Sequence, residues 1–147
     1  MNIIYLHGFQ SGSHSIKGQL LLQFCKKYPE ITLHLPDLNM PPQAAVEKVS
    51  ELIRSLPQVA LVGSSLGGFY ATYLVAKHAV PAVLINPAMR PWQLFRELFQ
   101  AELPYPVHPN WSLDVADLAQ LEQLALNPAQ DADKMLVLLQ QGDEVLD

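Results

Sequence analysis

Cysteine is nearly absent from this sequence of 147 residues. The single cysteine, Cys25, excludes an intrachain disulfide and with it a small disulfide-stabilised extracellular scaffold. Cys25 lies in an apolar stretch with helical spacing, so we expect a small buried side chain and not a reactive thiol. The sequence also has no cluster of residues with the spacing of metal ligands, and we expect no metal site.

Basic residues are scarce as well. Nine Lys and Arg residues against fourteen Asp and Glu residues give a formal net charge of −5 at pH 7, and no basic cluster is present. Because nucleic-acid binding needs clustered positive charge at the phosphates, we expect no nucleic-acid partner. No apolar run approaches the roughly 18 residues that a membrane helix needs, and residues 1–5 lack the features of a signal peptide. The expectation is a cytoplasmic protein without membrane contact.

The order of apolar patterns predicts the fold class. Half of the residues are hydrophobic, and the length fits one domain, which we assign to residues 1–147. The expected strands are 2–6, 31–35, 59–62, 81–85 and 135–141, and the expected helices between them are 15–27, 45–56 and 66–77. Strands separated by helices imply right-handed crossovers. We therefore predict an α/β fold with a mostly parallel sheet and helices on both faces.

Residues 91–130 interrupt this alternation. Two helical patterns, at 92–99 and 118–126, are separated by Pro104, Pro106 and Pro109. An insertion between two strands would lie above the site, so we predict a small helical lid. The alternative is ordinary structure that covers the sheet.

The chain is organised around residues 59–70. There Gly63-Ser64-Ser65-Leu66-Gly67 fits the pattern G-x-S-x-G where an expected strand meets an expected helix. In such a nucleophile elbow the serine sits on a strained turn, and the glycines leave space for its neighbours. The N–H groups at the start of the helix favour negative charge on a substrate oxygen. Ser65 is therefore the candidate nucleophile of an acyl transfer.

Acyl transfer by serine also needs donors for the oxyanion and a carboxylate that orients the base. The backbone N–H groups of Phe9 and Leu66 are the predicted donors. Asp143 follows the last expected strand and a glycine, which is the placement of the orienting carboxylate.

Substrate-binding positions are expected where parallel strands end, because sites in such sheets collect at the carboxyl ends of the strands. The loop after the first strand, the elbow and the segment after the fourth strand all fall there. We assign substrate-binding positions to His7, Gln10, Ser64 and Pro87.

The base is missing from this set. In hydrolases with this elbow a histidine follows the acid, but the five histidines of the chain all precede Asp143. His14, in a flexible loop near the strand ends, is the only one that we consider as a substitute. The others, which we expect to be structural or surface residues, are His7, His34, His78 and His108.

Five motifs together resemble the YqiA-like esterases, a small family within the α/β-hydrolase superfamily. They are Tyr5-Leu6-His7-Gly8-Phe9, Ser15-Ile16-Lys17, Gly63-Ser64-Ser65-Leu66-Gly67-Gly68, Ile85-Asn86-Pro87-Ala88-Met89-Arg90-Pro91 and Gly142-Asp143-Glu144-Val145-Leu146-Asp147. The resemblance implies an α/β-hydrolase fold and a serine esterase or thioesterase without a cofactor, in which Ser65 is the nucleophile and Asp143 the triad acid. Its substrate would be a small acyl ester or thioester.

The resemblance also implies that family members continue through a further helix and strand to a turn that carries the catalytic histidine. We expect that segment to be missing from these 147 residues, and we therefore expect weak or no turnover from them. We also expect self-association through an exposed sheet edge.

Two further functions compete with the esterase. One is a non-catalytic hydrolase-fold module that holds an acyl or carboxylate ligand, or an inactive fragment, because no histidine follows the triad acid. The weaker one is a phosphate-binding module, since residues 63–68 contain neither glycine-rich phosphate fingerprint.

Overall fold

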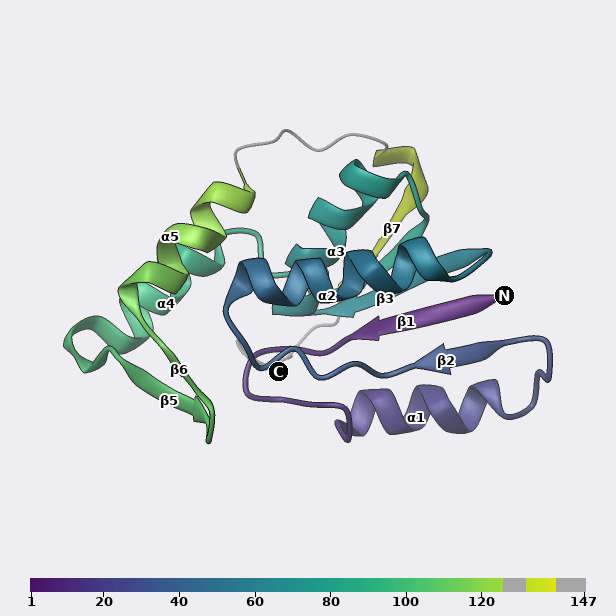
Figure 1. Cartoon of the computed structure of the whole chain (residues 1–147), viewed down its shortest axis with the longest axis horizontal. Coiled ribbons are helices and arrows are strands. Elements are labelled where there is room, and N and C mark those ends of the chain that lie inside the picture. The colour runs from purple at the N-terminus through teal and green to yellow at the C-terminus, as the bar shows by residue number, and fades with distance from the viewer. Residues whose placement is uncertain (126–131, 140–147) are drawn as a thin grey trace.

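The computed structural model describes residues 1–125 and 132–139 (Figure 1). One group of elements builds a layered body: β1 (Asn2–Leu6), α1 (Ile16–Cys25), β2 (Thr32–His34), α2 (Pro42–Ser55), β3 (Val59–Ser64), α3 (Leu66–His78), β4 (Ala82–Ile85) and β7 (Met135–Leu138). A second group lies between β4 and β7: α4 (Pro91–Phe99), the 3-10 helix η1 (Gln100–Glu102), β5 (Tyr105–His108), β6 (Trp111–Leu113), α5 (Val115–Leu124) and the 3-10 helix η2 (Ala132–Lys134). We call residues 91–125 the insertion.

The main sheet has five strands in the order β2-β1-β3-β4-β7, and every neighbouring pair is parallel. Parallel neighbours need a long return connection, which α1, α2 and α3 provide. The carboxyl ends of β1, β3 and β4 therefore meet at one edge of the sheet, where Leu6 pairs with Gly63 and Ser64 with Ile85. The predicted α/β class with a parallel sheet is confirmed.

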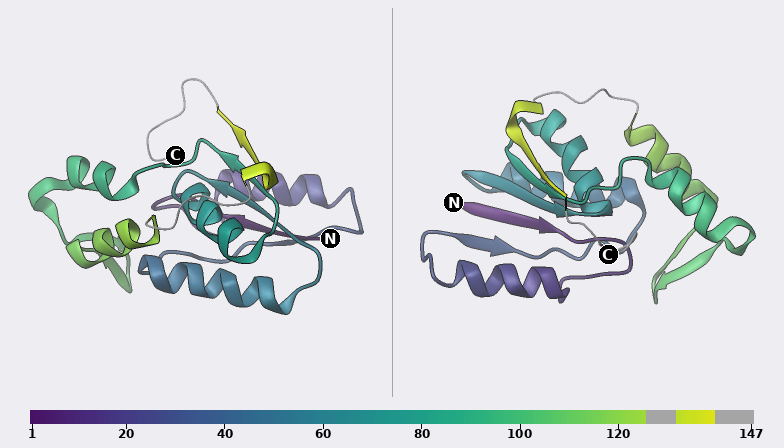
Figure 2. Two further views of the ribbon diagram at one scale, coloured as in Figure 1. Left: turned by 90° about the horizontal axis from the view of Figure 1, so that it is seen from above. Right: turned by 180° about the vertical axis from the view of Figure 1, so that it is seen from behind.

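Helices cover both faces of the sheet (Figure 2). α1 covers one face, because a Cβ atom added to Gly18 would lie 3.5 Å from the Tyr5 ring. Tyr5 pairs with Val62, so these side chains share the α1 face, whereas Ile4 and Leu61 face α2 and α3. Side chains on the α2–α3 face are fully buried, whereas Val62 is only half-buried. The most completely buried part of the core thus lies between the sheet and the pair α2–α3.

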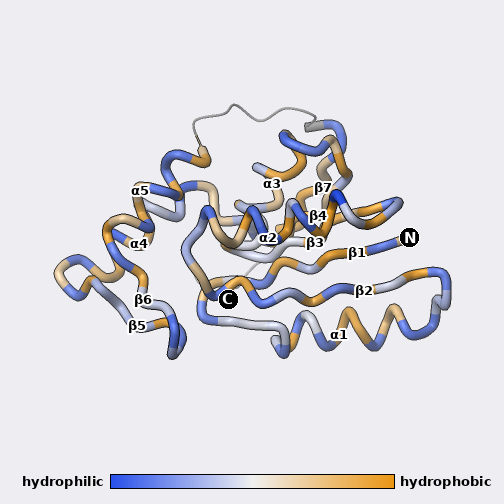
Figure 3. The backbone as a smooth tube through the Cα atoms, in the orientation of Figure 1, coloured by the Kyte–Doolittle hydropathy of each residue, from blue (hydrophilic) through white to orange (hydrophobic). Residues whose placement is uncertain are grey.

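Helix α1 forms where the pattern predicts it, and Ser15 is its N-cap, because the Ser15 hydroxyl accepts a hydrogen bond from the Gly18 N–H at 3.0 Å. Its apolar residues, however, do not all face the sheet. Ile16, Leu20 and Phe24 are 81%, 65% and 52% exposed, and the hydropathy colouring shows this apolar stretch along the helix (Figure 3). Cys25 is buried as expected, and burial raises the pKa of its thiol.

The insertion lies beyond the carboxyl ends of the strands (Figure 1). Its two helices are confirmed, but residues 105–113 form the antiparallel hairpin β5–β6, which the sequence did not predict. A proline usually interrupts the hydrogen-bond ladder between strands. Pro106 is tolerated here because both strands of a two-stranded ribbon are edge strands and because the register shifts between Pro106 and His108. α5 packs beside α2, where the Gln43 N–H donates to the Gln120 side chain at 3.1 Å. The role of the insertion as a lid stays a prediction.

Residues 1–125 and 132–139 contain neither a helix that could span a membrane nor a cluster of side chains that could hold a metal ion. No helix there is long and apolar enough to cross a bilayer. No group of three or more His, Cys, Asp or Glu residues there is placed to hold a metal ion.

Candidate active site

Ser65 occupies a sharp turn between β3 and α3. Its φ of 56° and ψ of −115° lie outside the regions that L-residues prefer, so the turn is strained. Backbone hydrogen bonds hold it: the Ser65 N–H donates to the Ile85 carbonyl at 3.0 Å, and the Ser65 carbonyl accepts from Gly68 at 3.0 Å and from Ala88 at 2.9 Å. The end of β4, the segment after it and the first turn of α3 therefore fix the position of the predicted nucleophile.

Three glycines make this turn sterically possible. A side chain at Gly63 would lie 2.5 Å from the Gly67 carbonyl oxygen, and one at Gly67 would overlap the Leu6 carbonyl. A side chain at Gly68 would lie 2.8 Å from Pro87. The first turn of α3 thus packs directly against the ends of β1 and β4, which is why the G-x-S-x-G pattern needs glycine at both ends.

The predicted oxyanion donors lie in the two turns next to Ser65. Phe9 is the second residue of a turn that the Ser11 N–H closes on the Gly8 carbonyl at 3.2 Å. Leu66 is the first residue of α3, where helix N–H groups have no acceptor within the helix. Within residues 1–125 and 132–139 neither the Phe9 nor the Leu66 N–H donates to a protein acceptor. No acceptor in the described part of the chain competes with a ligand oxygen for either N–H group.

The Phe9 side chain points away from solvent and anchors this turn to the insertion. It is 5% exposed, and its ring lies 4.6 Å from that of Phe95 and 5.9 Å from that of Phe99, measured between centroids. Gln10, at a left-handed φ of 62°, donates from Nε2 to the Tyr105 hydroxyl at 3.0 Å. The ring of Tyr105 in turn stacks on Phe99 at 4.3 Å. The insertion therefore supports the turn that presents the Phe9 N–H.

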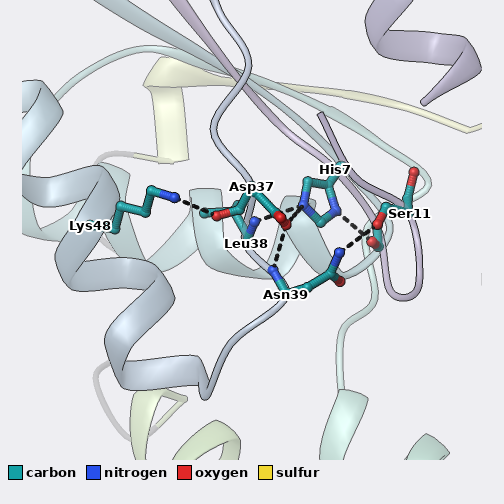
Figure 4. Close-up of polar contacts among 7 residues, drawn as sticks. His7, Ser11, Asp37, Leu38, Asn39 and Lys48 are labelled. Carbon is teal, nitrogen blue, oxygen red and sulfur yellow. Dashed lines mark hydrogen bonds and ion pairs between the residues drawn. The ribbon is translucent and has the colours of Figure 1, made fainter. Parts of the chain in front are cut away.

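His7 is held inside the protein by both ring nitrogens (Figure 4). Nδ1 lies 2.8 Å from the Gly8 carbonyl, and Nε2 accepts the Leu38 N–H at 2.8 Å. An Nε2 that accepts carries no proton, so the imidazole is neutral with its proton on Nδ1. Burial lowers the pKa of His7, and this outweighs the Gly8 carbonyl and the Asp37 carboxylate, which raise it. The 3.5 Å approach of Asp37 to Nε2 is consequently a contact with a neutral ring and not an ion pair.

The residues after β2 complete this network. Asn39 donates from Nδ2 to the Ser11 carbonyl at 2.7 Å and from its backbone to the Asp37 carboxylate at 3.0 Å. Lys48 of α2 donates to the Asp37 carbonyl at 2.8 Å. Burial raises the pKa of Asp37, but the Asn39 N–H and the nearby positive groups outweigh it, so the net direction is downward. Hydrogen bonds thus join the loop after β1 to the loop after β2 (Figure 4).

The other predicted positions are distributed as follows. Ser64 is the last residue of β3 and is 1% exposed, while Pro87 lies against Gly68 in the segment after β4. Phe9, Gln10, Ser64, Ser65, Leu66 and Pro87 all gather at the carboxyl ends of β1, β3 and β4. Asp143 lies outside the described residues.

All five histidines lie within the described residues, and none of them hydrogen-bonds to Ser65. His34 bonds to Asn2 at 3.0 Å, His78 to Ser50 at 2.9 Å, and His108 accepts from the Asn110 N–H at 3.2 Å. His14 is exposed. The geometry therefore shows an elbow and two available N–H donors, without a hydrogen bond from any imidazole of this chain to the Ser65 hydroxyl.

Residues 2–147 match the model of a family described as Uncharacterised protein family (UPF0227). The chain belongs to UPF0227. The family expected from the sequence motifs is thereby confirmed.

Solved structures agree with this assignment at the level of the fold. Alpha/beta hydrolase domain-containing protein 10 from mouse is 18% identical to the UPF0227 chain, with a TM-score of 0.69 over 99% of this chain and 70% of its own. Est1E from Butyrivibrio proteoclasticus, solved with ferulic acid bound, is 14% identical, with a TM-score of 0.66 over 94% and 67%. An extracellular alpha/beta-hydrolase from a Paenibacillus species is 14% identical, with a TM-score of 0.57 over 99% and 80%. The UPF0227 chain has an α/β-hydrolase fold.

Sequence reasoning missed two groups of residues at this site. Tyr105 and the aromatic cluster around Phe9 come from the insertion, about ninety positions away in the sequence, and no motif marks them. The Asp37–Asn39 segment carried a sequence signal, because it follows Pro36, two residues beyond the end of β2, and so lies near a strand end. In the UPF0227 chain this segment contacts His7 and Ser11 in the loop after β1.

Proposed function

We propose that this protein is a serine hydrolase that cleaves small acyl esters or thioesters. The observation that carries the proposal is the strained Ser65 turn together with the N–H groups of Phe9 and Leu66, which have no acceptor among residues 1–125 and 132–139. The Ser65 oxygen would attack the acyl carbon, and the charge on the carbonyl oxygen would be stabilised by these two donors. The ester or thioester bond would then break, and the alcohol or thiol would leave with a proton. Water would hydrolyse the remaining acyl-serine to the carboxylic acid and free Ser65.

The Ser65 proton has to pass to a base in this reaction, and the five histidines do not supply one. We propose Asp143 as the carboxylate that would orient a base. Loss of one member of a serine triad typically costs on the order of 10⁴ to 10⁶ in rate. The 147 residues by themselves should therefore turn over substrate weakly.

A fluorophosphonate probe followed by intact-mass measurement tests the nucleophile. We expect one adduct, located at Ser65, that forms slowly and is lost in Ser65→Ala. Ser55→Ala, at an exposed serine at the end of α2, is the matched control and should label like the parent protein. Added imidazole should speed the labelling, because it replaces the missing base. An adduct that persists in Ser65→Ala would contradict the proposal.

No histidine of the chain hydrogen-bonds to Ser65, and this observation supports a second candidate function. The second candidate is a non-catalytic module that holds an acyl or carboxylate ligand at the elbow. This candidate predicts ligand binding without any covalent adduct, with or without imidazole. Binding that survives Ser65→Ala, together with no adduct in the parent protein, would favour it over the hydrolase.

A further inference from the structure

A cavity of about 480 Å³ lies next to the elbow on the α1 side of the sheet. Its wall is formed by the turn after β1, by the first turn of α1 and by the last residue of β3. Tyr5 and Ser64 contribute from the sheet, and Ser15 and Ile16 contribute from α1. The cavity therefore begins one residue before Ser65, shares β3 and the turn after β1 with the candidate active site, and extends from there to α1.

Ser64, which lines this cavity, carries a buried hydroxyl that is unsatisfied among the described residues. The side chain is two positions beyond Val62 in β3, so it points to the α1 face, and it is 1% exposed. Within residues 1–125 and 132–139 its hydroxyl has no hydrogen-bond partner. Burial of a hydroxyl without a partner is unfavourable, and such groups in native proteins call for an explanation. A ligand in the cavity would provide the missing partner.

The start of α1 adds a second donor to the same wall. The Ser15 side chain caps Gly18, and the Ser15 N–H donates to the Gly12 carbonyl at 3.1 Å. The N–H of Ile16, the first residue of the helix, donates to no acceptor in the described part of the chain. The first turn of this ten-residue helix has no acidic side chain. Its positive end therefore favours a bound anion.

The charges of the wall agree with an anionic ligand. Its ionisable side chains are Tyr5, His14 and Lys17, and none of the described residues that form it is an aspartate or glutamate. Among the described residues of the wall a cation would find no carboxylate, and a carboxylate or phosphate would meet hydroxyl and N–H donors there without repulsion from an acidic side chain.

We propose that this cavity is a subsite for a compact anionic group, a carboxylate or a phosphate, that the substrate carries beside its scissile acyl bond. The Ser64 hydroxyl and the Ile16 N–H donate hydrogen bonds to the oxygens of that group. Anion binding itself is independent of catalysis, whereas the assignment of the anion to a substrate rests on the hydrolase function proposed above.

Calorimetric titration with two matched esters tests the subsite. Monomethyl succinate carries one carboxylate, and dimethyl succinate is its uncharged counterpart. We expect the monoester to bind at least ten times more tightly than the diester. Inorganic phosphate, titrated in parallel, shows which oxyanion the cavity prefers. Equal affinity for the two esters together with no binding of phosphate would overturn the proposal.

Substitutions locate the binding and separate it from catalysis. Ser64→Ala should reduce the affinity for the preferred anion about tenfold, while Ser55→Ala should leave it unchanged. Ser65→Ala should also retain anion binding. Loss of labelling would therefore count against the hydrolase alone, and loss of anion binding would count against the subsite alone. In amide NMR spectra of the parent protein, the Ile16 N–H should shift on titration with the anion. An unchanged affinity in Ser64→Ala, or an Ile16 amide that does not move, would refute the assignment.

Discussion

At the scale of single residues, the site depends on glycines at which an added Cβ atom would collide with neighbouring atoms. Gly67 is the clearest case, because its Cα lies against the main chain at the end of β1, and a methyl group would overlap the Leu6 carbonyl. The neighbour is backbone and cannot rotate away. Gly12, in the loop after β1, offers a contrast, because a methyl group there would meet only the Asn39 side chain at 3.8 Å.

Gly67→Ala should therefore destabilise the protein by about 2 kcal/mol or more, as expected for a collision inside a packed region. Gly12→Ala is the control and should change the free energy of unfolding by less than about 1 kcal/mol. Urea unfolding of the two variants and the parent protein measures both values. Similar stabilities for the two variants would mean that the first turn of α3 packs less tightly than the structure shows.

At the scale of elements, the insertion and the turn after β1 behave as one unit. Phe9 packs into an aromatic cluster with Phe95 and Phe99, and Gln10 is bonded to Tyr105. Oxyanion stabilisation depends on donors that are already in place before the reaction. We therefore expect the hairpin β5–β6, through Tyr105, to position the turn that presents the Phe9 N–H.

Tyr105→Phe tests this role, because it removes the hydroxyl but keeps the ring that stacks on Phe99. We expect the kcat of the Ser65-dependent hydrolysis of an aryl acetate to fall roughly three- to tenfold with little change in KM, since the transition state alone uses the oxyanion donors. Tyr28→Phe, at an exposed tyrosine just beyond α1, is the control and should leave both constants unchanged. A rise in KM at constant kcat would instead assign Tyr105 to substrate binding.

At the scale of the whole molecule, stability depends on two histidines that fold in the neutral form. Burial lowers the pKa of His7, and burial together with Lys77 and Arg54 lowers the pKa of His78. Their folded pKa values lie below the ordinary value of about 6.5, so the unfolded chain binds protons first as the pH falls. Their contribution to stability is complete above that pH and is lost below it.

The free energy of unfolding should consequently decrease between pH 7.5 and pH 6.0, as measured by urea unfolding at both values. Burial raises the pKa of Asp117, which favours the folded state at lower pH, so the comparison stops at pH 6.0. An NMR titration of His7 provides the independent check and should show a neutral ring with its proton on Nδ1 at pH 6.5. A stability that is constant or rises over this interval would contradict the burial of neutral imidazoles.

The exposed apolar side chains of the edge strand β7 support the expected self-association. Among the described strands β7 pairs only with β4, and its residues Leu136, Val137 and Leu138 are 57%, 49% and 48% exposed. An apolar edge of this kind is a template for strand pairing. Sedimentation at increasing concentration should show association that Val137→Lys reduces, while Leu20→Lys on the exposed side of α1 serves as the control. A monomer at all concentrations would refute the prediction.

The local sequence was sufficient for much of this molecule. The periodicity of residues 2–85 predicts the first four strands and the three helices between them, because each element expresses its own spacing of apolar side chains. The glycines around Ser65 predict the elbow, because a tight turn between a strand and a helix needs them locally. The cap at Ser15 and the burial of Cys25 follow in the same way.

Other features were decided only by the tertiary structure. The neutral state of His7 depends on Leu38, thirty-one positions away, and the support of Phe9 and Gln10 depends on residues of the insertion some ninety positions away. The exposure of Ile16, Leu20 and Phe24 depends on how α1 lies on the sheet and not on its own pattern. Periodicity shows which residues share a face but not what that face meets, so these contacts became known only once the chain was folded.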